Sequence, residues 1–174
     1  MLAFDNDPFG PRQSRFWKLR NSAMPKPQPW RWPLERRDDC GPIVLARHAS
    51  FDRSGVELGY APREIELNAP VYAAQDGRLM FCGETRTGYA ISIDHVGCGF
   101  ATYYGHLSKV DLPFNYLRRK PRIPVRGGDL IGFAAKSPLR FELWQWTEDR
   151  GFVPVDPVER MKEWTVIEPK KAES

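Results

Sequence analysis

Short apolar segments separated by glycine-rich turns constrain the fold of this chain more than any other feature of its sequence. Residues 79–82 and 89–93 are two such segments, and the loop between them, 83–88, is rich in residues that favour turns. This spacing predicts a β-hairpin. After the Gly97-Cys98-Gly99 turn, residues 100–104 continue the pattern as another strand. The central part of the chain is therefore predicted to form antiparallel β-structure.

Another strand is predicted over residues 140–146, where apolar and polar side chains alternate with a period of two. A helix is predicted at one place only, within residues 156–164, where Asp156 would cap the helix and Pro157 would stand in its first turn. The predicted fold class is therefore mainly β with one short C-terminal helix. In the predicted strand, Phe141, Leu143 and Gln145 share one face, and Arg140, Glu142, Trp144 and Trp146 share the other.

The first 31 residues show no helical or strand period. Prolines at positions 8, 11, 25, 27 and 29 interrupt any regular element. Aromatic residues interleaved with them distinguish this stretch from a plain flexible linker. We predict three regions: an extended arm over 1–31, a folded domain over 32–155, and a short helix with a polar tail over 156–174. The arm is expected to lie along its own domain or along a neighbouring subunit.

Positive charge is concentrated in two places, although the formal net charge of the whole chain is only +4. Residues 1–37 contain eight Lys or Arg and three Asp or Glu, and five more basic residues lie between positions 118 and 126. Such charge is either solvated or docks onto an acidic protein face or an anionic polymer. No recognition helix accompanies it, so nucleic acid is not expected as a partner.

The sequence also predicts where the protein is made. No run of 18 apolar residues is present, so we expect no membrane span. The N-terminal residues are acidic where a signal peptide would be basic, and no apolar stretch follows them. We therefore expect a protein synthesised in the cytoplasm without an export signal.

Five fragments, in their order along the chain, carry a resemblance to a known family: 32–34, 69–79, 88–95, 102–107 and 123–132. The most distinctive is Thr102-Tyr103-Tyr104-Gly105-His106-Leu107, which is similar to a Thr-x-Tyr-x-His-Leu motif. Together they resemble the lysostaphin-type (LytM-like) zinc endopeptidases, which cut peptidoglycan cross-links. The resemblance implies a lysostaphin-like peptidase core of antiparallel sheets.

The residues at the family's metal and catalytic positions depart from its pattern. Where the family has His-x-His-Phe-Glu, this chain has Pro138 and Arg140 in place of the two histidines. Where it has His-x-Gly-x-Asp, alignment on the glycine places Arg53 and Glu57 at the two ligand positions. Neither proline nor arginine offers a side-chain lone pair to zinc. The resemblance therefore implies a degenerate member that lacks its metal ligands.

An alternative alignment uses His48 and Asp52, which are also four residues apart but have no glycine between them. It supplies two zinc ligands and lacks the third that a catalytic zinc requires. The cysteines offer no replacement, because Cys40, Cys82 and Cys98 lack CxxC spacing, and we expect free thiols, although a disulfide from Cys40 stays open.

From these positions we predict that Arg53, Glu57 and Arg140 face the former metal cleft. We also predict that the Arg140 guanidinium pairs with the Glu57 carboxylate, so that a guanidinium replaces the zinc ion as the cation. His106 matches a catalytic position of the family and would be the catalytic residue of an active enzyme; without a metal we expect it to be packed and hydrogen-bonded. No cofactor is expected, and zinc would be expected only under the alternative alignment.

Three functions are compatible with the sequence. The first, which we favour, is a non-catalytic structural or docking protein, a component of a phage virion such as its tail or baseplate, which binds other protein subunits through the N-terminal arm. The second is an active zinc endopeptidase that uses His48, Asp52 and His106 on peptidoglycan cross-links. The third is a cell-wall-binding or regulatory module, in which Trp144 and Trp146 would offer stacking faces to peptidoglycan.

Overall fold

The computed structural model describes residues 28–37, 40–49, 54–61, 68–95, 97–115 and 123–170. Most of the arm predicted over 1–31, together with Asp52 and Arg53 and four of the five basic residues between 118 and 126, lies outside these ranges. The described chain is mainly β, as predicted, and its helix is short. The elements are β1 (Arg31–Glu35), β2 (Ile43–Ala49), β3 (Ser54–Gly59), β4 (Pro70–Tyr72), β5 (Gly77–Thr85), β6 (Gly88–His95), β7 (Phe100–Val110), β8 (Pro124–Val125), β9 (Leu130–Ala134), β10 (Leu139–Thr147), β11 (Gly151–Val155), α2 (Val158–Met161) and β12 (Thr165–Ile167).

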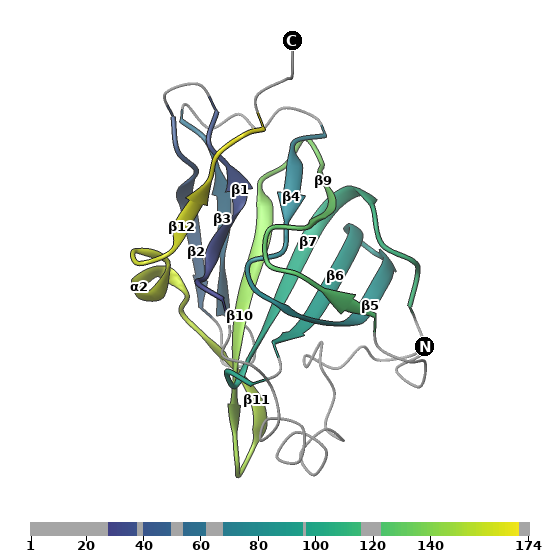
Figure 1. Ribbon diagram of the computed structural model, residues 1–174, viewed down its shortest axis with the longest axis vertical. Coiled ribbons are helices and arrows are strands. Elements are labelled where there is room, and N and C mark those ends of the chain that lie inside the picture. The colour runs from purple at the N-terminus through teal and green to yellow at the C-terminus, as the bar shows by residue number, and fades with distance from the viewer. Residues whose placement is uncertain are drawn as a thin grey trace.

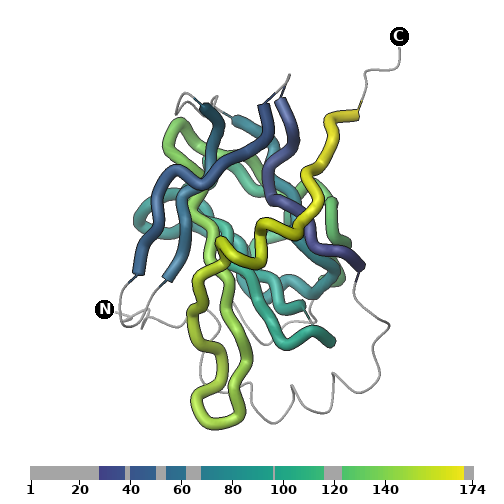
Figure 2. Tube along the Cα trace, turned by 90° about the vertical axis from the view of Figure 1, so that its left-hand side faces the viewer, coloured from purple at the N-terminus to yellow at the C-terminus, as the bar shows by residue number. Residues whose placement is uncertain are grey.

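The strands form one curled sheet system whose main path runs β12-β1-β4-β9-β7-β10-β3-β2 (Figure 1). Strands β5 and β6 extend it from β7, β8 pairs with β5, and β11 pairs with β10. The β10–β11 hairpin projects beyond the rest of the described strands (Figure 2). Neighbouring strands are antiparallel throughout this path, except that β1 and β12 run parallel.

The predicted hairpin is longer than the sequence suggested. Strands β5 and β6 pair from Arg78 with Asp94 to Thr85 with Gly88, so only two residues are left for the turn. Much of the predicted loop 83–88 is therefore strand. Gly88 has a φ of 114°, which non-glycine residues avoid and which the turn requires at this point.

Strand β7 changes its partners at a bulge. Its first half, up to Gly105, pairs with β10, whereas Leu107 to Val110 pair with β9. Between the two halves, His106 has a φ of 60°, in the left-handed region that residues with a side chain rarely adopt. The bulge therefore fixes where His106 stands in the fold.

The segment from Asp156 to Ile167 packs against the N-terminal strand β1. Helix α2 begins at Val158, whose N–H donates to Oδ1 of Asp156 at 3.0 Å, in keeping with the predicted helix start. The sequence did not predict β12, which runs parallel to β1. Trp32 donates from Nε1 to the Met161 carbonyl at 3.1 Å, so the two ends of the described chain are joined side by side.

Two clusters of buried apolar residues lie in the structure. The larger one is built from nearly all of the elements and includes Leu34, Tyr104, Phe141 and Met161. The smaller one consists of Met80, Ala90, Ala101, Tyr103, Trp144 and Phe152. Phe141 and Trp144 fall in different clusters, which confirms that the two faces of β10 were correctly assigned from the sequence.

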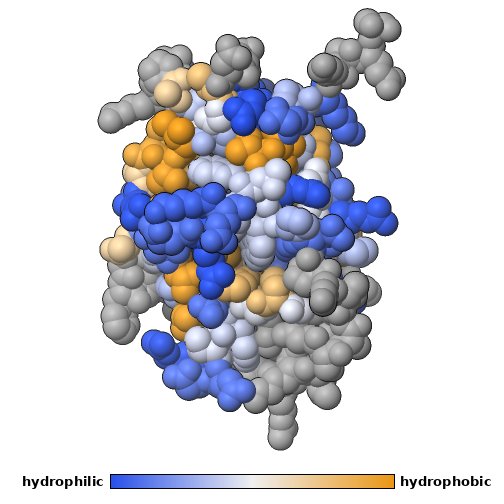
Figure 3. All heavy atoms as spheres, turned by 60° about the vertical axis from the view of Figure 1, so that its left-hand side comes forward, coloured by the Kyte–Doolittle hydropathy of each residue, from blue (hydrophilic) through white to orange (hydrophobic). Residues whose placement is uncertain are grey.

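On the face shown in Figure 3, hydrophobic residues lie in separate patches between hydrophilic ones. Among the described residues, the large hydrophobic side chains that are exposed are Ile43, at 40%, and Phe114, at 54%. No described helix is long and apolar enough to cross a membrane.

Candidate functional site

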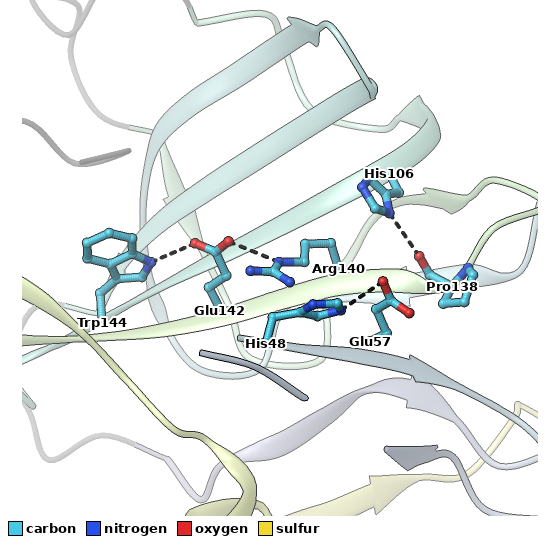
Figure 4. A network of polar contacts seen from close by, with 7 residues as sticks. All are labelled: His48, Glu57, His106, Pro138, Arg140, Glu142 and Trp144. Atoms are coloured by element: carbon cyan, nitrogen blue, oxygen red, sulfur yellow. Dashed lines mark hydrogen bonds and ion pairs between the residues drawn. The ribbon is translucent and has the colours of Figure 1, made fainter. Parts of the chain in front are cut away.

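The candidate site lies where β3 and β10 pair, because this register brings the predicted positions together. Glu57 on β3 stands opposite Arg140 on β10. On the other side of β3, His48 of β2 stands opposite Gly55. The structure therefore gathers three of the predicted residues, His48, Glu57 and Arg140, on adjacent strands (Figure 4).

Arg140 pairs with a different carboxylate from the one predicted. Its Nε donates to Oε1 of Glu142 at 3.1 Å, two residues further along the same face of β10. The predicted pair of Arg140 with Glu57 is therefore wrong. The carboxylate of Glu57 instead lies 3.0 Å from Nε2 of His48. Spacing of two along a strand places side chains on the same face, and this explains the Arg140–Glu142 contact.

Glu142 is the central acceptor of this network. Its side chain is completely buried, and its second oxygen, Oε2, accepts a hydrogen bond from Nε1 of Trp144 at 3.0 Å. A buried carboxylate is costly unless it is paired and hydrogen-bonded, so the two donors on either side of it stabilise its charge. The sequence signal for this role was available, since Arg140, Glu142 and Trp144 alternate on one face.

Gly55 makes room for this network. A Cβ at position 55 would lie 2.7 Å from Cγ of Glu142 and 2.8 Å from the carbonyl oxygen of Phe141. Both distances are shorter than carbon atoms tolerate. The glycine is therefore required by the close approach of β3 to the buried Glu142 side chain.

His106 is packed and hydrogen-bonded, but through the backbone. Its Nδ1 donates to the carbonyl oxygen of Pro138 at 3.3 Å (Figure 4). Its own carbonyl accepts from the Ala135 N–H at 3.1 Å. Pro138, which stands where the family has a catalytic histidine, thus contributes a carbonyl group to this site.

The donor set of the described residues, which do not include Asp52, does not fit a zinc ion. Among the residues that the structure describes, no three His, Cys, Asp or Glu side chains are grouped so that they could hold a metal. Glu57 and His48 supply one carboxylate and one imidazole, and the next side chain across the strands, Arg140, is only a donor. A catalytic zinc requires three protein ligands and an open position. The described residues therefore offer no metal-based step.

A second polar network lies away from this site and is structural. His95 is fully buried; its Nδ1 donates to the Asp76 carbonyl at 2.9 Å, and its Nε2 lies 2.7 Å from Oγ1 of Thr102. Burial lowers the pKa of His95 to about 4, because the charged imidazolium loses its solvation. The ring is therefore neutral near pH 7, so Nε2 accepts from the Thr102 hydroxyl. The chain of contacts continues to the Tyr104 hydroxyl at 3.0 Å, and that hydroxyl accepts from the Ala74 N–H at 2.9 Å.

The cysteines do not form a catalytic site. All three are free, and Cys98 bonds to the His95 carbonyl through Sγ at 3.1 Å. Burial raises the pKa of Cys98, and likewise of Cys82, to about 11, which keeps both thiols protonated at neutral pH. A thiol nucleophile paired with His95 is therefore excluded, since the imidazole beside it already uses both nitrogens.

The prediction that Trp144 and Trp146 offer stacking faces to peptidoglycan is wrong for Trp144. Trp144 is 2% exposed and belongs to the smaller buried cluster, so its ring is not available to a glycan. Trp146 is partly buried and meets the Phe152 ring edge-on at 5.3 Å between centroids. A cavity of about 250 Å³ lies elsewhere, beside Trp30 and Trp164, whose rings stack at 4.9 Å.

This chain is similar to several solved structures. A chain of the SpoIIIAH–SpoIIQ complex is 18% identical, with a TM-score of 0.53, and the match covers 75% of this chain and 98% of that one. A putative glycyl-glycine endopeptidase LytM from Ruminococcus gnavus is 20% identical, with a TM-score of 0.51, and 66% and 48% are covered. Lysostaphin is 20% identical, with a TM-score of 0.48, and 68% and 49% are covered. The chain thus spans about half the length of the last two proteins, and identities this low establish the fold alone.

No curated protein sequence matches this chain. The model of peptidase family M23, in contrast, matches residues 54–151, which is more than half of the chain. This range contains Glu57, His106, Arg140 and Glu142, so the match includes β3 and β10 of the candidate site but not β2, which carries His48. On the strength of this match, the chain belongs to peptidase family M23.

Proposed function

We propose that this chain is a non-catalytic docking protein built on the M23 peptidase fold. The observation that carries the proposal is the Arg140–Glu142 pair, which occupies the strand on which the family holds a zinc-binding histidine. The guanidinium supplies a fixed positive charge there, and Glu142 and Trp144 hold the strand face together without a metal.

We also propose a class of partner for this protein and the assembly to which it belongs. The SpoIIIAH–SpoIIQ complex is an assembly of two proteins in which one chain has this fold. We infer that the present chain likewise binds another protein subunit and that the basic, aromatic N-terminal arm, 1–31, makes the contact. A phage virion, in its tail or baseplate, is the setting we propose for this docking function.

Zinc content and peptidoglycan cleavage test whether the protein is non-catalytic. The purified protein, expressed with zinc supplied, is expected to contain far less than one equivalent of zinc by elemental mass spectrometry, and to release no fragments from purified peptidoglycan. Zinc near one equivalent that is lost in His48→Ala would overturn the proposal.

The second candidate, an active zinc endopeptidase, is favoured by one contact, the 3.0 Å approach of His48 to Glu57. It would require Asp52 or another side chain to complete the ligand set, with His106 as the catalytic residue. The same zinc measurement separates the two functions. Virion placement is tested separately, by finding the chain at fixed stoichiometry in purified phage particles.

A further inference from the structure

A cavity borders strand β10 on the face opposite to the candidate site. Its volume is about 250 Å³, and its apolar wall consists of Leu143 and three aromatic rings, those of Trp30, Phe100 and Trp164. Leu143 follows Glu142 directly in β10, and successive residues of a strand point to opposite faces. The cavity is therefore separate from the network around Glu142.

The aromatic wall is held in place by contacts between the two ends of the described chain. The Thr165 N–H donates to the Trp30 carbonyl at 3.0 Å, and the rings of Trp30 and Trp164 stack at 4.9 Å between their centroids. Two edge-on contacts fix these rings further: Trp30 meets Phe100 at 6.0 Å, and Trp164 meets Phe141 at 5.9 Å. Because the rings pack against one another, the wall is already formed before a ligand binds.

Two opposite charges stand beside this apolar wall. Arg160 at the end of α2 and Glu163 in the following turn also line the cavity, and both residues are exposed. The Glu163 N–H donates to the Arg160 carbonyl at 3.1 Å, which keeps the two residues in one turn of the chain. Within the described part of the chain, neither side chain forms an ion pair, whereas the neighbouring Glu159 and Lys162 pair with each other at 2.6 Å. A cation and an anion at this cavity are therefore both available to a ligand.

The Arg160 guanidinium is already oriented by the aromatic wall. Its Cζ lies 4.4 Å from the centroid of the Phe100 ring, in a cation–π contact. Stacking of this kind uses one face of the planar guanidinium and leaves the N–H groups around its edge able to donate. The edge of a guanidinium matches a carboxylate, which accepts two parallel hydrogen bonds from it. Arg160 is thus suited to bind a carboxylate beside Phe100.

The arrangement of these groups defines the chemistry of a ligand. The ligand must bring together an apolar group for the wall, an anionic acceptor for Arg160 and a donor for Glu163. The C-terminal residue of a polypeptide carries all three on a single Cα, as its side chain, its carboxylate and its N–H. An internal residue lacks the anionic group. Cavities for drug-sized ligands measure about 300–1,000 Å³, so a cavity of about 250 Å³ suits one residue rather than a longer segment.

We propose that this cavity binds the C-terminal residue of another polypeptide, one with a large apolar side chain. The terminal carboxylate accepts hydrogen bonds from the Arg160 guanidinium, and the last peptide N–H donates to the Glu163 carboxylate. The apolar side chain packs against Leu143 and the aromatic rings. The binding itself is independent of the proposed docking function, but its use as a contact with a partner subunit rests on that function.

Titration of the full chain with short peptides tests the site. The probe is acetyl-Gly-Gly-Phe with a free carboxylate, followed through the amide and indole N–H signals of the protein in a nitrogen–proton NMR spectrum. We expect saturable shifts at Arg160, Glu163 and the indole groups of Trp30 and Trp164. The same peptide with an amidated C-terminus is expected to bind about tenfold more weakly, because it loses a charge-assisted hydrogen bond. Acetyl-Gly-Gly-Ala is also expected to bind about tenfold more weakly, because it buries less apolar surface.

Substitution of Arg160 assigns the carboxylate to its partner. Arg160→Met is expected to weaken binding of the free-acid peptide about tenfold and to leave binding of the amidated peptide unchanged. Arg150→Met is the matched control, since Arg150 is exposed in the turn between β10 and β11, and it should bind both peptides as the unsubstituted protein does.

Equal binding of the free-acid and amidated peptides would overturn the proposal. Equal binding of the free-acid peptide by Arg160→Met and the unsubstituted protein would also overturn it, as would the absence of shifts at the cavity. Zinc near one equivalent would remove the proposed non-catalytic function and leave the peptide result standing, so the two failures are distinguishable.

Discussion

Nε of Arg140 lies 3.1 Å from Oε1 of Glu142, two residues along the same strand and on the same face. The Arg140 side chain is 15% exposed and the Glu142 side chain is completely buried. This pair stands in a fold whose active members place a zinc-binding histidine at the position of Arg140. A charge-assisted hydrogen bond between two side chains of one strand thus lies where the resemblance to the zinc endopeptidases implies a metal ligand.

Removal of the Arg140 charge is expected to destabilise the protein. In Arg140→Met, the buried Glu142 keeps Trp144 as a donor but loses the charge-assisted bond from the Arg140 guanidinium, and the cost is roughly 3 kcal/mol in the free energy of unfolding. Urea denaturation measures it. Arg150→Met is the matched control, since Arg150 and Asp149 are 72% and 77% exposed, and we expect a change below about 0.5 kcal/mol.

A double variant that makes both members of the Arg140–Glu142 pair neutral tests the same interaction. Arg140→Met/Glu142→Gln removes both charges and keeps an acceptor for Nε1 of Trp144, so it is expected to regain at least half of the stability lost in Arg140→Met. Equal stability of Arg140→Met and the unsubstituted protein would show that the ion pair contributes nothing.

Substitutions at the former ligand positions distinguish the two alignments. If Arg53 and Glu57 occupy the ligand positions, Arg53→His/Glu57→Asp/Arg140→His creates three ligands and should bind about one zinc, whereas Arg140→His alone should not. If His48 and Asp52 are the ligands instead, Arg140→His alone completes the set. Elemental mass spectrometry of dialysed, folded protein measures both. Zinc bound by the single variant and lost on adding Asp52→Ala would contradict our alignment.

His95 is expected to make the stability fall in acid. Its pKa drops from 6.5 to about 4 on folding, so between these values the unfolded chain binds more protons than the folded one. Stability from this residue is therefore complete above about pH 6.5 and declines as the pH falls toward 4, by about 3 kcal/mol in all, at 1.36 kcal/mol per pKa unit.

Urea denaturation at pH 7, 6, 5 and 4 measures this decline. His95→Asn can still donate to the Asp76 carbonyl but does not titrate, so it should be less stable at pH 7 and show a shallower loss between pH 6.5 and 5. Identical pH profiles would place the acid sensitivity in other groups.

The backbone at His106 predicts an unusual order among variants. A φ of 60° costs a residue with a side chain roughly 1–2 kcal/mol, least for asparagine and most for β-branched residues. His106→Asn is therefore expected to remain within about 0.5 kcal/mol of the unsubstituted protein, whereas His106→Val should lose about 1–2 kcal/mol. Thermal and urea denaturation of both variants would measure these differences in stability. A valine variant as stable as the asparagine one would mean that the bulge relaxes.

Much of the fold was predictable because it follows local rules. The hairpin of β5 and β6, the two faces of β10 and the helix start at Asp156 were read from alternation, turn residues and capping. The order of five motif fragments predicted the family. Strand β12 was missed, because three residues in a polar context become a strand only by pairing with β1, more than 120 residues earlier.

The candidate site, like the fold, could be predicted from the sequence only in part. The sequence by itself determined that the histidines are replaced at positions 138 and 140 and that Arg140, Glu142 and Trp144 share one face of a strand, since both facts depend only on residue identity and a period of two. Only the tertiary structure decided which carboxylate Arg140 would pair with, because that choice depends on the register of β3 against β10 and on which acid is buried. Glu142 is buried completely and cannot be solvated, so it takes the guanidinium, while the partly exposed Glu57 is left to His48.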